Sequence, residues 1–259
     1  MQIATWNVNS IRARAPRVIP FLQRTNVDVL AMQEIKCKPE QFPIADFEAI
    51  GYKVIAHGLN QWNGVAFAYK EHLEPQEVEF EFRSQPEFKD IVEARALSAV
   101  FNDVKIYSLY VPHGRGLEDP HMEYKLEFLD RLAADVAEQL EMEPDAQIAL
   151  TGDFNIAPLD SDVFNVSYFE THVSEPERQA FEAFDQIGFS DKLRELVPEQ
   201  YTYWDYKDFR FPRNEGMRID FQLTSPALTE RVVGASIERD ERKGEGPSDH
   251  VPVIVALSD

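Results

Sequence analysis

Short runs of apolar residues alternate along the chain with longer stretches in which apolar residues recur every three or four positions. The short runs are rich in Val, Ile, Leu, Ala and aromatic residues, which is typical of buried β-strands. Alternation of strands with helical segments predicts a layered α/β or α+β fold. We therefore expect strands over residues 27–32, 64–69, 105–110, 147–151 and 251–257.

Two of the longer stretches have the spacing of amphipathic helices. One lies between Pro120 and Pro144, and the other spans residues 175–187, with Pro176 well placed in the first helical turn. No Ser/Gly-rich linker divides the chain, so we expect a single domain over residues 1–259.

Composition narrows the class of protein. The chain has 259 residues, of which 44% are hydrophobic and 12% aromatic, so it can bury a core and does not resemble a disordered chain. A single cysteine, Cys37, excludes a disulfide framework and a zinc site of four cysteines. The first residues lack a signal-peptide pattern, and no apolar run reaches the roughly 18 residues that span a bilayer. These features predict a cytoplasmic protein without a membrane partner.

The net charge of −20 argues at first against nucleic acid, because phosphate binding draws on Lys and Arg. The acidic excess is concentrated, however, in residues 71–94 and 117–145, whereas residues 1–40 carry six basic and three acidic side chains. We therefore expect one face around the functional site to be basic or neutral and the remaining surface to be acidic.

Polar clusters stand where apolar strands are expected to end. Loops converge at such ends in layered folds, and functional sites collect there. Each cluster alone has a plain structural explanation, since Asn, Gly and Asp suit turns and a Glu at a strand end is usually solvated. Together they supply several carboxylates, amides, a Tyr and a His, from residues 5–9, 32–34, 110–114, 151–155, 217–220 and 248–250.

These side chains favour phosphoryl chemistry. Hard oxygen ligands suit Mg²⁺ or Mn²⁺, and no Cys/His cluster suits zinc. The chain has neither the G-x-S-x-G turn of acyl-transferring hydrolases nor the phosphate-binding P-loop. Paired carboxylates also occur in glycosidases, but a glycosidase would not account for the basic and aromatic residues near these clusters.

The chain resembles the exonuclease III family, bacterial abasic-site endonucleases and 3′-exonucleases of the endonuclease/exonuclease/phosphatase superfamily. The resemblance runs from residue 2 to about residue 257 through the segments TWNVNSIRAR, MQEIK, YVPHGR, TGDFNIAP, YTYWDYK, GMRIDFQLTSP and PSDHVPV. The segments RAR, QEIK, YWDYK and MRID are specific to the DNA-repair branch. The resemblance implies a four-layer α/β-sandwich, in which two mainly antiparallel sheets pack face to face between helices.

The resemblance also implies an activity and its residues. The activity is Mg²⁺-dependent cleavage 5′ to abasic sites, with removal of nucleotides or blocking groups from 3′ ends of duplex DNA, by a monomer. The implied metal ligands are Glu34, Asn7, Asp249 and Asp153. Asp153 would also orient or deprotonate the attacking water, or protonate the leaving 3′ oxygen. The other implied catalytic residues are Tyr110 and Asn155 on the phosphate, and His250 oriented by Asp220.

DNA contacts are expected from basic and aromatic side chains. The basic candidates are Arg12, Lys36, Arg95, Arg115 and Lys125. The alternative interpretation of each is an ordinary basic residue that keeps the surface soluble. An exposed Trp204 is expected to meet the sugar that lacks a base, with Met217 lining the same pocket.

Two other functions remain open at this level. A phosphodiesterase of the same superfamily acting on an inositol phosphate or a sphingolipid would share the metal and His chemistry. A non-catalytic nucleic-acid-binding regulator would share the fold but would have lost catalytic residues, whereas all of those implied are present in this chain.

Overall fold

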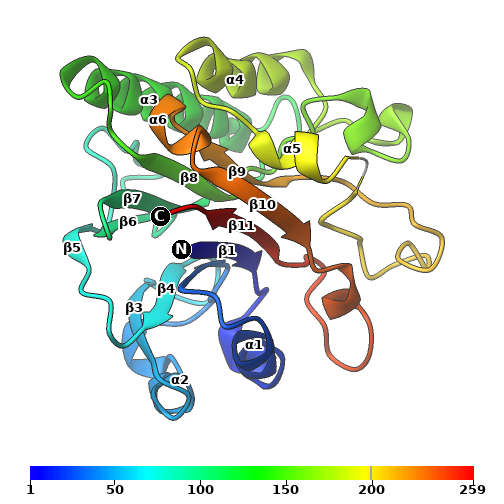
Figure 1. Ribbon diagram of the computed structural model, residues 1–259. Helices are drawn as coiled ribbons and strands as arrows, with labels where there is room; N and C mark the ends of the chain where they lie inside the picture. Colours follow the sequence, from blue (N-terminus) through cyan, green and yellow to red (C-terminus); the bar gives the residue numbers. More distant parts are fainter. Residues whose placement is uncertain (199) are drawn as a thin grey trace.

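Two β-sheets pack face to face in the computed structural model, which describes residues 1–198 and 200–259 (Figure 1). The first sheet has six strands in the spatial order β10 (Val232–Ile237), β11 (Val253–Leu257), β1 (Gln2–Asn7), β2 (Val29–Gln33), β4 (Val65–Lys70) and β3 (Tyr52–His57). The second has five, in the order β5 (Gln76–Glu79), β6 (Ala96–Phe101), β7 (Val104–Tyr110), β8 (Ile148–Asp153) and β9 (Asp220–Thr224).

Each sheet contains one parallel pair of strands, β1–β2 and β7–β8, and every other pairing is antiparallel. The predicted arrangement of two mainly antiparallel sheets is therefore confirmed. The two parallel pairs matter for function, because the carboxyl ends of both strands of a pair meet at one edge of the sheet.

Helices cover the outer faces of both sheets (Figure 1). α1 and α2 pack on the six-stranded sheet through residues such as Phe21 and Phe47, and α3 and α4 pack on the five-stranded sheet through residues such as Phe128 and Phe184. The four layers of the predicted sandwich are thus present. The helices are α1 (Ile11–Thr25), α2 (Ile44–Glu48), α3 (Pro120–Met142), α4 (Glu175–Gln186), α5 (Lys192–Leu196) and α6 (Pro226–Thr229), with single 3₁₀ turns at Pro39–Gln41, Asp160–Asp162, Val166–Tyr168 and Arg239–Arg242.

The inner faces of the two sheets form a common core. Phe67 of β4 meets Phe101 of β6 edge to face, with ring centroids 5.6 Å apart. The same layer holds a buried polar link, in which Gln33 Nε2 donates to Ser108 Oγ at 3.0 Å. Because buried polar groups are costly when unpaired, this link favours one alignment of the two sheets.

The predicted elements agree with the structure. All five predicted runs contain strands, and the two predicted helices are α3 and α4. α1 was not predicted, because Pro16 and Pro20 lie inside it and proline normally interrupts a helix. No helix among the described residues combines the length and the apolar character needed to cross a membrane.

Candidate active site

The candidate site lies where the ends of the two sheets meet. Asn7 is the last residue of β1 and Glu34 directly follows β2, so the parallel pair of the first sheet brings them together. Tyr110 and Asp153 end β7 and β8 and stand opposite each other in register, and Asp153 faces Asp220 of β9. The strand ends thus place side chains from both sheets around one point.

Gly152 permits the close approach of β7 and β8 at this edge. A Cβ atom at this position would lie 2.0 Å from the carbonyl oxygen of Leu109, a distance that no side chain tolerates. Glycine is therefore required directly before Asp153 for the carboxylate to stand beside Tyr110.

Asn7 joins the carboxylates of the two sheets. Its Nδ2 donates to Glu34 Oε1 and to Asp153 Oδ2, both at 2.9 Å. Its Oδ1 accepts from the backbone N–H of Asn9 at 3.0 Å. Since a backbone N–H only donates, this bond fixes the orientation of the amide. Asn7 thus presents its nitrogen rather than its oxygen to the carboxylates, which differs from the metal-ligand role expected for it.

Glu34 is held as an ionised carboxylate. Burial alone would raise its pKa, but the nearby Lys36 ammonium and the hydrogen bond from Asn7 lower the pKa below its ordinary value. Lys36 Nζ lies 2.7 Å from Glu34 Oε2 and also donates to Asn9 Oδ1 at 2.6 Å. An ionised, part-exposed carboxylate of this kind is suited to a divalent cation.

His250 lies between two buried aspartates. Its Nδ1 is 2.8 Å from Asp220 Oδ2, and its Nε2 is 3.7 Å from Asp153 Oδ2. Burial would lower the pKa of His250, but Asp220 and Asp153 raise it to about 10. Burial raises the pKa of Asp153 to about 7, although the imidazolium of His250 opposes the shift. Asp153 and His250 therefore titrate as a linked pair, with His250 charged at neutral pH.

Glu34, Asp153 and His250 offer ligand atoms that all lie within 4.8 Å of one another, so the cluster could hold a metal ion. His250 is a poor ligand in this arrangement, because both nitrogens of an imidazolium carry protons. The carboxylates of Glu34 and Asp153 remain, and they fit a hard divalent cation. Asp249 lines the same cavity, and its Oδ1 accepts from Asn9 Nδ2 at 3.0 Å.

Asn155 is held by its backbone and its side chain. The residue has a left-handed φ of 52°, its N–H donates to Asp153 Oδ1 at 2.9 Å, and its Nδ2 donates to Val111 O at 2.9 Å. The bond to Val111 uses one of the two protons on Nδ2. The second proton remains available as a hydrogen-bond donor beside the carboxylates.

Arg95 is not a surface contact for DNA, contrary to expectation. It is 6% exposed, it pairs with Glu93 at 2.6 Å, and its Nη1 donates to Tyr110 O at 3.2 Å. Its guanidinium carbon lies 4.8 Å from the centre of the Tyr110 ring. Burial raises the pKa of Tyr110 well above its ordinary value, and the carboxylate of Glu34 adds to the shift. Burial and Glu34 thus keep the Tyr110 hydroxyl neutral, although the charge of Arg95 opposes the shift, and Arg95 supports the ring from behind through its contact with the ring face.

The prediction that Lys125 contacts DNA at the surface is also wrong. Its side chain is fully buried and forms an ion pair with Glu177, which is equally buried. Lysine is almost never fully buried unless it is paired, so the expectation of a surface phosphate contact was reasonable from sequence alone. The arrangement around Lys125 excludes direct contact with DNA in this structure.

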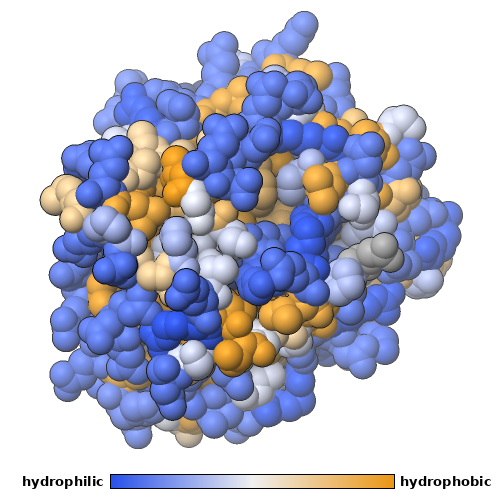
Figure 2. Space-filling view, turned by 45° about the horizontal axis from the view of Figure 1, so that its top comes forward, coloured by the Kyte–Doolittle hydropathy of each residue, from blue (hydrophilic) through white to orange (hydrophobic). Residues whose placement is uncertain are grey.

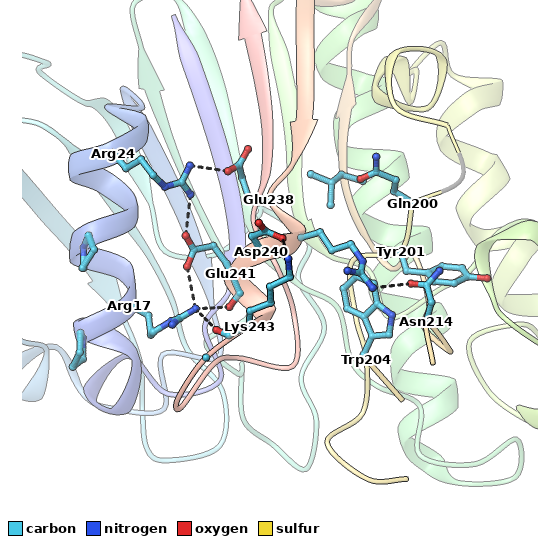
Figure 3. Close-up of a pocket in the computed structure, with 15 residues that line it drawn as sticks. Arg17, Arg24, Gln200, Tyr201, Trp204, Asn214, Glu238, Asp240, Glu241 and Lys243 are labelled. Carbon is cyan, nitrogen blue, oxygen red and sulfur yellow. Dashed lines mark hydrogen bonds and ion pairs between the residues drawn. The ribbon is translucent and has the colours of Figure 1, made fainter. Parts of the chain in front are cut away.

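Trp204 is buried rather than exposed, so the expected aromatic contact with a sugar is wrong in this structure. Its indole packs against Phe211 with ring centroids 5.1 Å apart, and Gly216 lies directly against its nitrogen. Trp204 lines a separate pocket of about 1060 Å³, which Figure 3 shows in close-up. The charged residues there are largely paired with one another, as Arg24 is with Glu238 and Glu241.

The functional cavity itself has a volume of about 480 Å³ and an aromatic wall. Met217 lines this cavity, as expected, and is 4% exposed. Arg210 lies over the rings of Tyr168 and Phe164 at 4.3 and 4.9 Å from their centres. The cavity is thus lined by apolar surface and a cation as well as by the carboxylates of Glu34 and Asp153.

Arg12 and Arg115 are exposed, as a phosphate contact requires, and Lys36 is partly exposed. Arg12 Nη2 donates to Lys36 O at 3.3 Å, so these two basic residues are neighbours. The face shown in Figure 2 is mostly hydrophilic, with hydrophobic residues in small separate groups.

The expectation of a basic or neutral rim is wrong for one side of the cavity. Residues 205–215 contribute Lys207 and Arg210 but also Asp205, Asp208 and Glu215 to its lining. Arg210 forms ion pairs with Glu215 and Asp208, so its charge is compensated locally. The rim thus carries charges of both signs.

His172 is a functional candidate that the sequence did not reveal. It has a left-handed φ of 72°, and its Nε2 lies 3.3 Å from Asn155 Oδ1. Its ring meets that of His113 edge to face, with centroids 4.6 Å apart. Burial and the nearby Lys125 lower the pKa of His172 well below its ordinary value. No periodicity or motif marks His172, because its contacts come from the packing of separate loops.

A sequence model of the Endonuclease/Exonuclease/phosphatase family matches residues 4–250. Among curated proteins, the chain is 32% identical to exodeoxyribonuclease III of Haemophilus influenzae over 98% of both chains. It is 28% identical to the DNA repair nuclease APEX1 of Danio rerio, over all of this chain and 82% of the relative.

Solved structures of related proteins are similar to this chain over its full length. An AP endonuclease from Archaeoglobus fulgidus superposes with a TM-score of 0.91 at 36% identity, over the full length of both chains. The 3′ phosphatase NExo from Neisseria, bound to a product DNA hairpin, superposes with a TM-score of 0.93 at 33% identity, again over both full lengths. The chain therefore belongs to the endonuclease/exonuclease/phosphatase family.

Proposed function

We propose that the protein is a Mg²⁺-dependent DNA repair nuclease. It hydrolyses the phosphodiester 5′ to abasic sites and removes nucleotides or blocking groups from the 3′ ends of duplex DNA. The observation that carries the proposal is the cluster of an ionised Glu34, Asp153 and a charged His250 at the meeting ends of both sheets, in which Asn7 joins the two carboxylates. Relatives with nuclease names match over nearly their whole length.

Glu34 would be the main ligand of the cation, with Asp153 beside it as a weaker ligand, and Asn7 orients both carboxylates. When bound, the ion supplies charge neutralisation at the scissile phosphate. Glu34 suits this role because it stays ionised, and Lys36 limits the repulsion between Glu34 and a phosphate.

His250 stabilises the negative charge that develops on the phosphate. Asp220 holds its Nδ1–H, so the Nε2–H faces Asp153 and the cavity. A preorganised imidazolium in a buried site needs little rearrangement during the reaction. The Asn155 amide and the neutral Tyr110 hydroxyl add donors on the same side.

Asp153 exchanges the proton of the reaction. Its raised pKa matches neutral pH, which is the condition for an efficient general acid or base. It takes a proton from the attacking water or gives one to the leaving 3′ oxygen. Asn7 and the backbone N–H of Asn155 hold its two oxygens in place for this step.

DNA binds across the hydrophilic face beside the cavity. Arg12, Lys36 and Arg115 contact the phosphate backbone, and a nucleotide or sugar at the reaction site enters the cavity lined by Met217. Because the rim is not uniformly basic, few phosphate contacts support binding, so non-specific binding is weak and falls only moderately with added salt.

Product analysis on matched duplexes tests the proposal. The substrates are duplexes with one abasic site, a recessed 3′ end or a 3′ phosphate, together with a soluble phosphoester, each with Mg²⁺ and with a chelator. We expect Mg²⁺-dependent cleavage of DNA, lost in Glu34→Ala and His250→Ala prepared in the same way. Hydrolysis of the soluble ester alone, or DNA cleavage that survives in both variants, would contradict the assignment.

A further inference from the structure

We propose that Lys125 is a positioning residue, whose buried ammonium group holds the two loops that carry Asn155 and His113 in the geometry needed for cleavage. The inference rests on the proposed function, because the step that it supports is phosphodiester hydrolysis. Lys125 touches no reacting atom, so it acts through Asn155 rather than on the substrate.

Lys125 has three acceptors for its three protons. Nζ donates to the carbonyl oxygen of Asn155 at 2.7 Å, to the carbonyl oxygen of His113 at 3.3 Å, and to Glu177 Oε1. The side chain is fully buried. An ammonium group with every proton used in this way is fixed in position, and it fixes its partners in turn.

The two carbonyl groups belong to different loops. His113 follows β7 and Asn155 follows β8, so Nζ bridges the loops after the two parallel strands of the second sheet. Within residues 1–198 and 200–259, no main-chain N–H donates to either carbonyl oxygen. Lys125 is thus the donor that the protein provides for both groups.

The bond to Asn155 orients its amide. Asn155 adopts a left-handed φ of 52°, and its Nδ2 donates back to Val111 O in the neighbouring loop. Left-handed backbone is unfavourable for most residues with a side chain and persists when the surroundings impose it. Holding the Asn155 carbonyl from one side and its amide from the other leaves the second amide proton free for a substrate in the cavity that Asn155 lines.

Glu177 fixes Lys125 from the opposite side. It lies in the first turn of α4, where its Oε2 accepts from Ser174 Oγ at 2.6 Å and from Ser174 N at 3.2 Å. The chain of contacts therefore runs from the start of α4 through Glu177 and Lys125 to both loops. Apolar residues of similar volume often give at least equal stability in place of a buried ion pair, so stability alone does not require this arrangement.

The test separates positioning from stability. Lys125→Met alone leaves Glu177 buried and unpaired, and we expect a lower melting temperature. Lys125→Met combined with Glu177→Leu removes both charges, and we expect most of the stability to return. The cleavage rate of an abasic duplex at saturating Mg²⁺ should remain at least tenfold below wild type in this double variant, with KM for DNA changed less than threefold.

Two further variants make the result specific. Glu177→Gln keeps the Lys125 amine and an acceptor for it, so its kcat should stay within about threefold of wild type. Lys105→Met with Glu79→Leu removes a more exposed lysine–glutamate pair, 2.8 Å long, at the opposite end of β7, and should leave kcat unchanged. Mn²⁺ affinity measured by electron paramagnetic resonance should be the same in all variants, because Glu34 and Asp153 are untouched.

The outcomes are distinct. A double variant that melts like wild type and also cleaves at the wild-type rate would overturn the positioning role while leaving the proposed function intact. A kcat in Glu177→Gln as low as in Lys125→Met would assign the effect to charge pairing and also overturn it, even if the double variant does not fold. Lack of cleavage of every DNA substrate by the wild-type protein would instead refute the proposed function.

Discussion

Two carboxylates share one asparagine yet have opposite electrostatic environments. Glu34, after β2, lies beside Lys36 at the partly open side of the site, and its pKa is lowered. Asp153, at the end of β8, is fully enclosed near Asp220 and His250, and its pKa is raised to about 7. Asn7 donates to both at 2.9 Å, so the difference comes from burial and neighbouring charges rather than from this hydrogen bond.

This difference assigns different work to two chemically similar groups. A carboxylate kept ionised suits a cation, whereas one whose pKa lies near neutrality suits proton transfer. Opposite shifts in neighbouring acids identify such a division of roles. Each sheet contributes one member, which explains why the site forms only where both sheets end.

The largest effect is expected from Asp153→Asn. The amide keeps the size of the carboxyl group but can neither take nor give the proton, so we expect kcat to fall on the order of 10³-fold. Single-turnover cleavage of an abasic duplex measures the change, with duplex affinity as the control. Retention of more than a tenth of the wild-type rate would remove Asp153 from proton transfer.

A smaller effect, which depends on the metal concentration, is expected from Glu34→Gln. The loss of an anionic ligand should weaken Mn²⁺ binding by roughly tenfold or more and lower the cleavage rate at limiting metal. Excess metal should restore part of the rate, which it should not do for Asp153→Asn. Equal metal dependence in the two variants would contradict the division of roles.

The charge of His250 is expected to depend on Asp220. The pKa of His250 is raised to about 10, so metal-free wild-type protein should show an imidazolium signal by NMR throughout pH 6 to 8. Asp220→Asn removes the main favourable charge and should move the titration of His250 towards its ordinary pKa of about 6.5. An unchanged His250 titration in this variant would show that Asp153 alone maintains the charge.

The same raised pKa has a consequence for stability. A group protonated more readily in the folded state stabilises the protein fully below its unfolded-state pKa of about 6.5. That contribution is lost as the pH rises through about 10. The melting-temperature difference between wild type and Asp220→Asn should therefore shrink between these two pH values.

The smallest effect is expected from Lys36→Met. The pKa of Glu34 is lowered partly by Lys36, so the pair stabilises the fold above the ordinary pKa of 4.5 and loses this effect as the pH falls through the lower folded-state value. Because Lys36 is partly exposed, we expect a cost below about 1 kcal/mol at pH 7 and none at strongly acidic pH. Thermal melts of the metal-free variant across this range measure it, and a cost that persists in acid would point to packing instead.

Residues at strand ends were predictable, whereas buried cations were not. Glu34, Asp153, Asp220 and His250 come from motifs next to apolar strands, and the structure brings them together. Arg95 and Lys125 were expected on the surface, because nothing in a linear sequence distinguishes a solvated cation from one paired inside. Their partners, Glu93 and Glu177, are ordinary acidic residues until the fold places them.

The net charge of −20 illustrates the same limit. Its uneven distribution along the chain was visible, but the rim of the cavity carries both signs, because residues 205–215 bring paired acids and bases to it. Charge along a sequence becomes charge on a surface only through packing. The salt dependence of DNA binding is therefore set by the charges on the binding surface of the folded protein rather than by the total net charge.

The sequence by itself determined the layered architecture and most residues of the candidate site, because hydrophobic periodicity and strand-end motifs are local properties of the chain. Only the tertiary structure decided that Trp204 is buried, that Asn7 joins the two carboxylates, and that Lys125 ties two loops together. These outcomes depend on contacts between residues distant in sequence, and burial and pKa follow from such contacts.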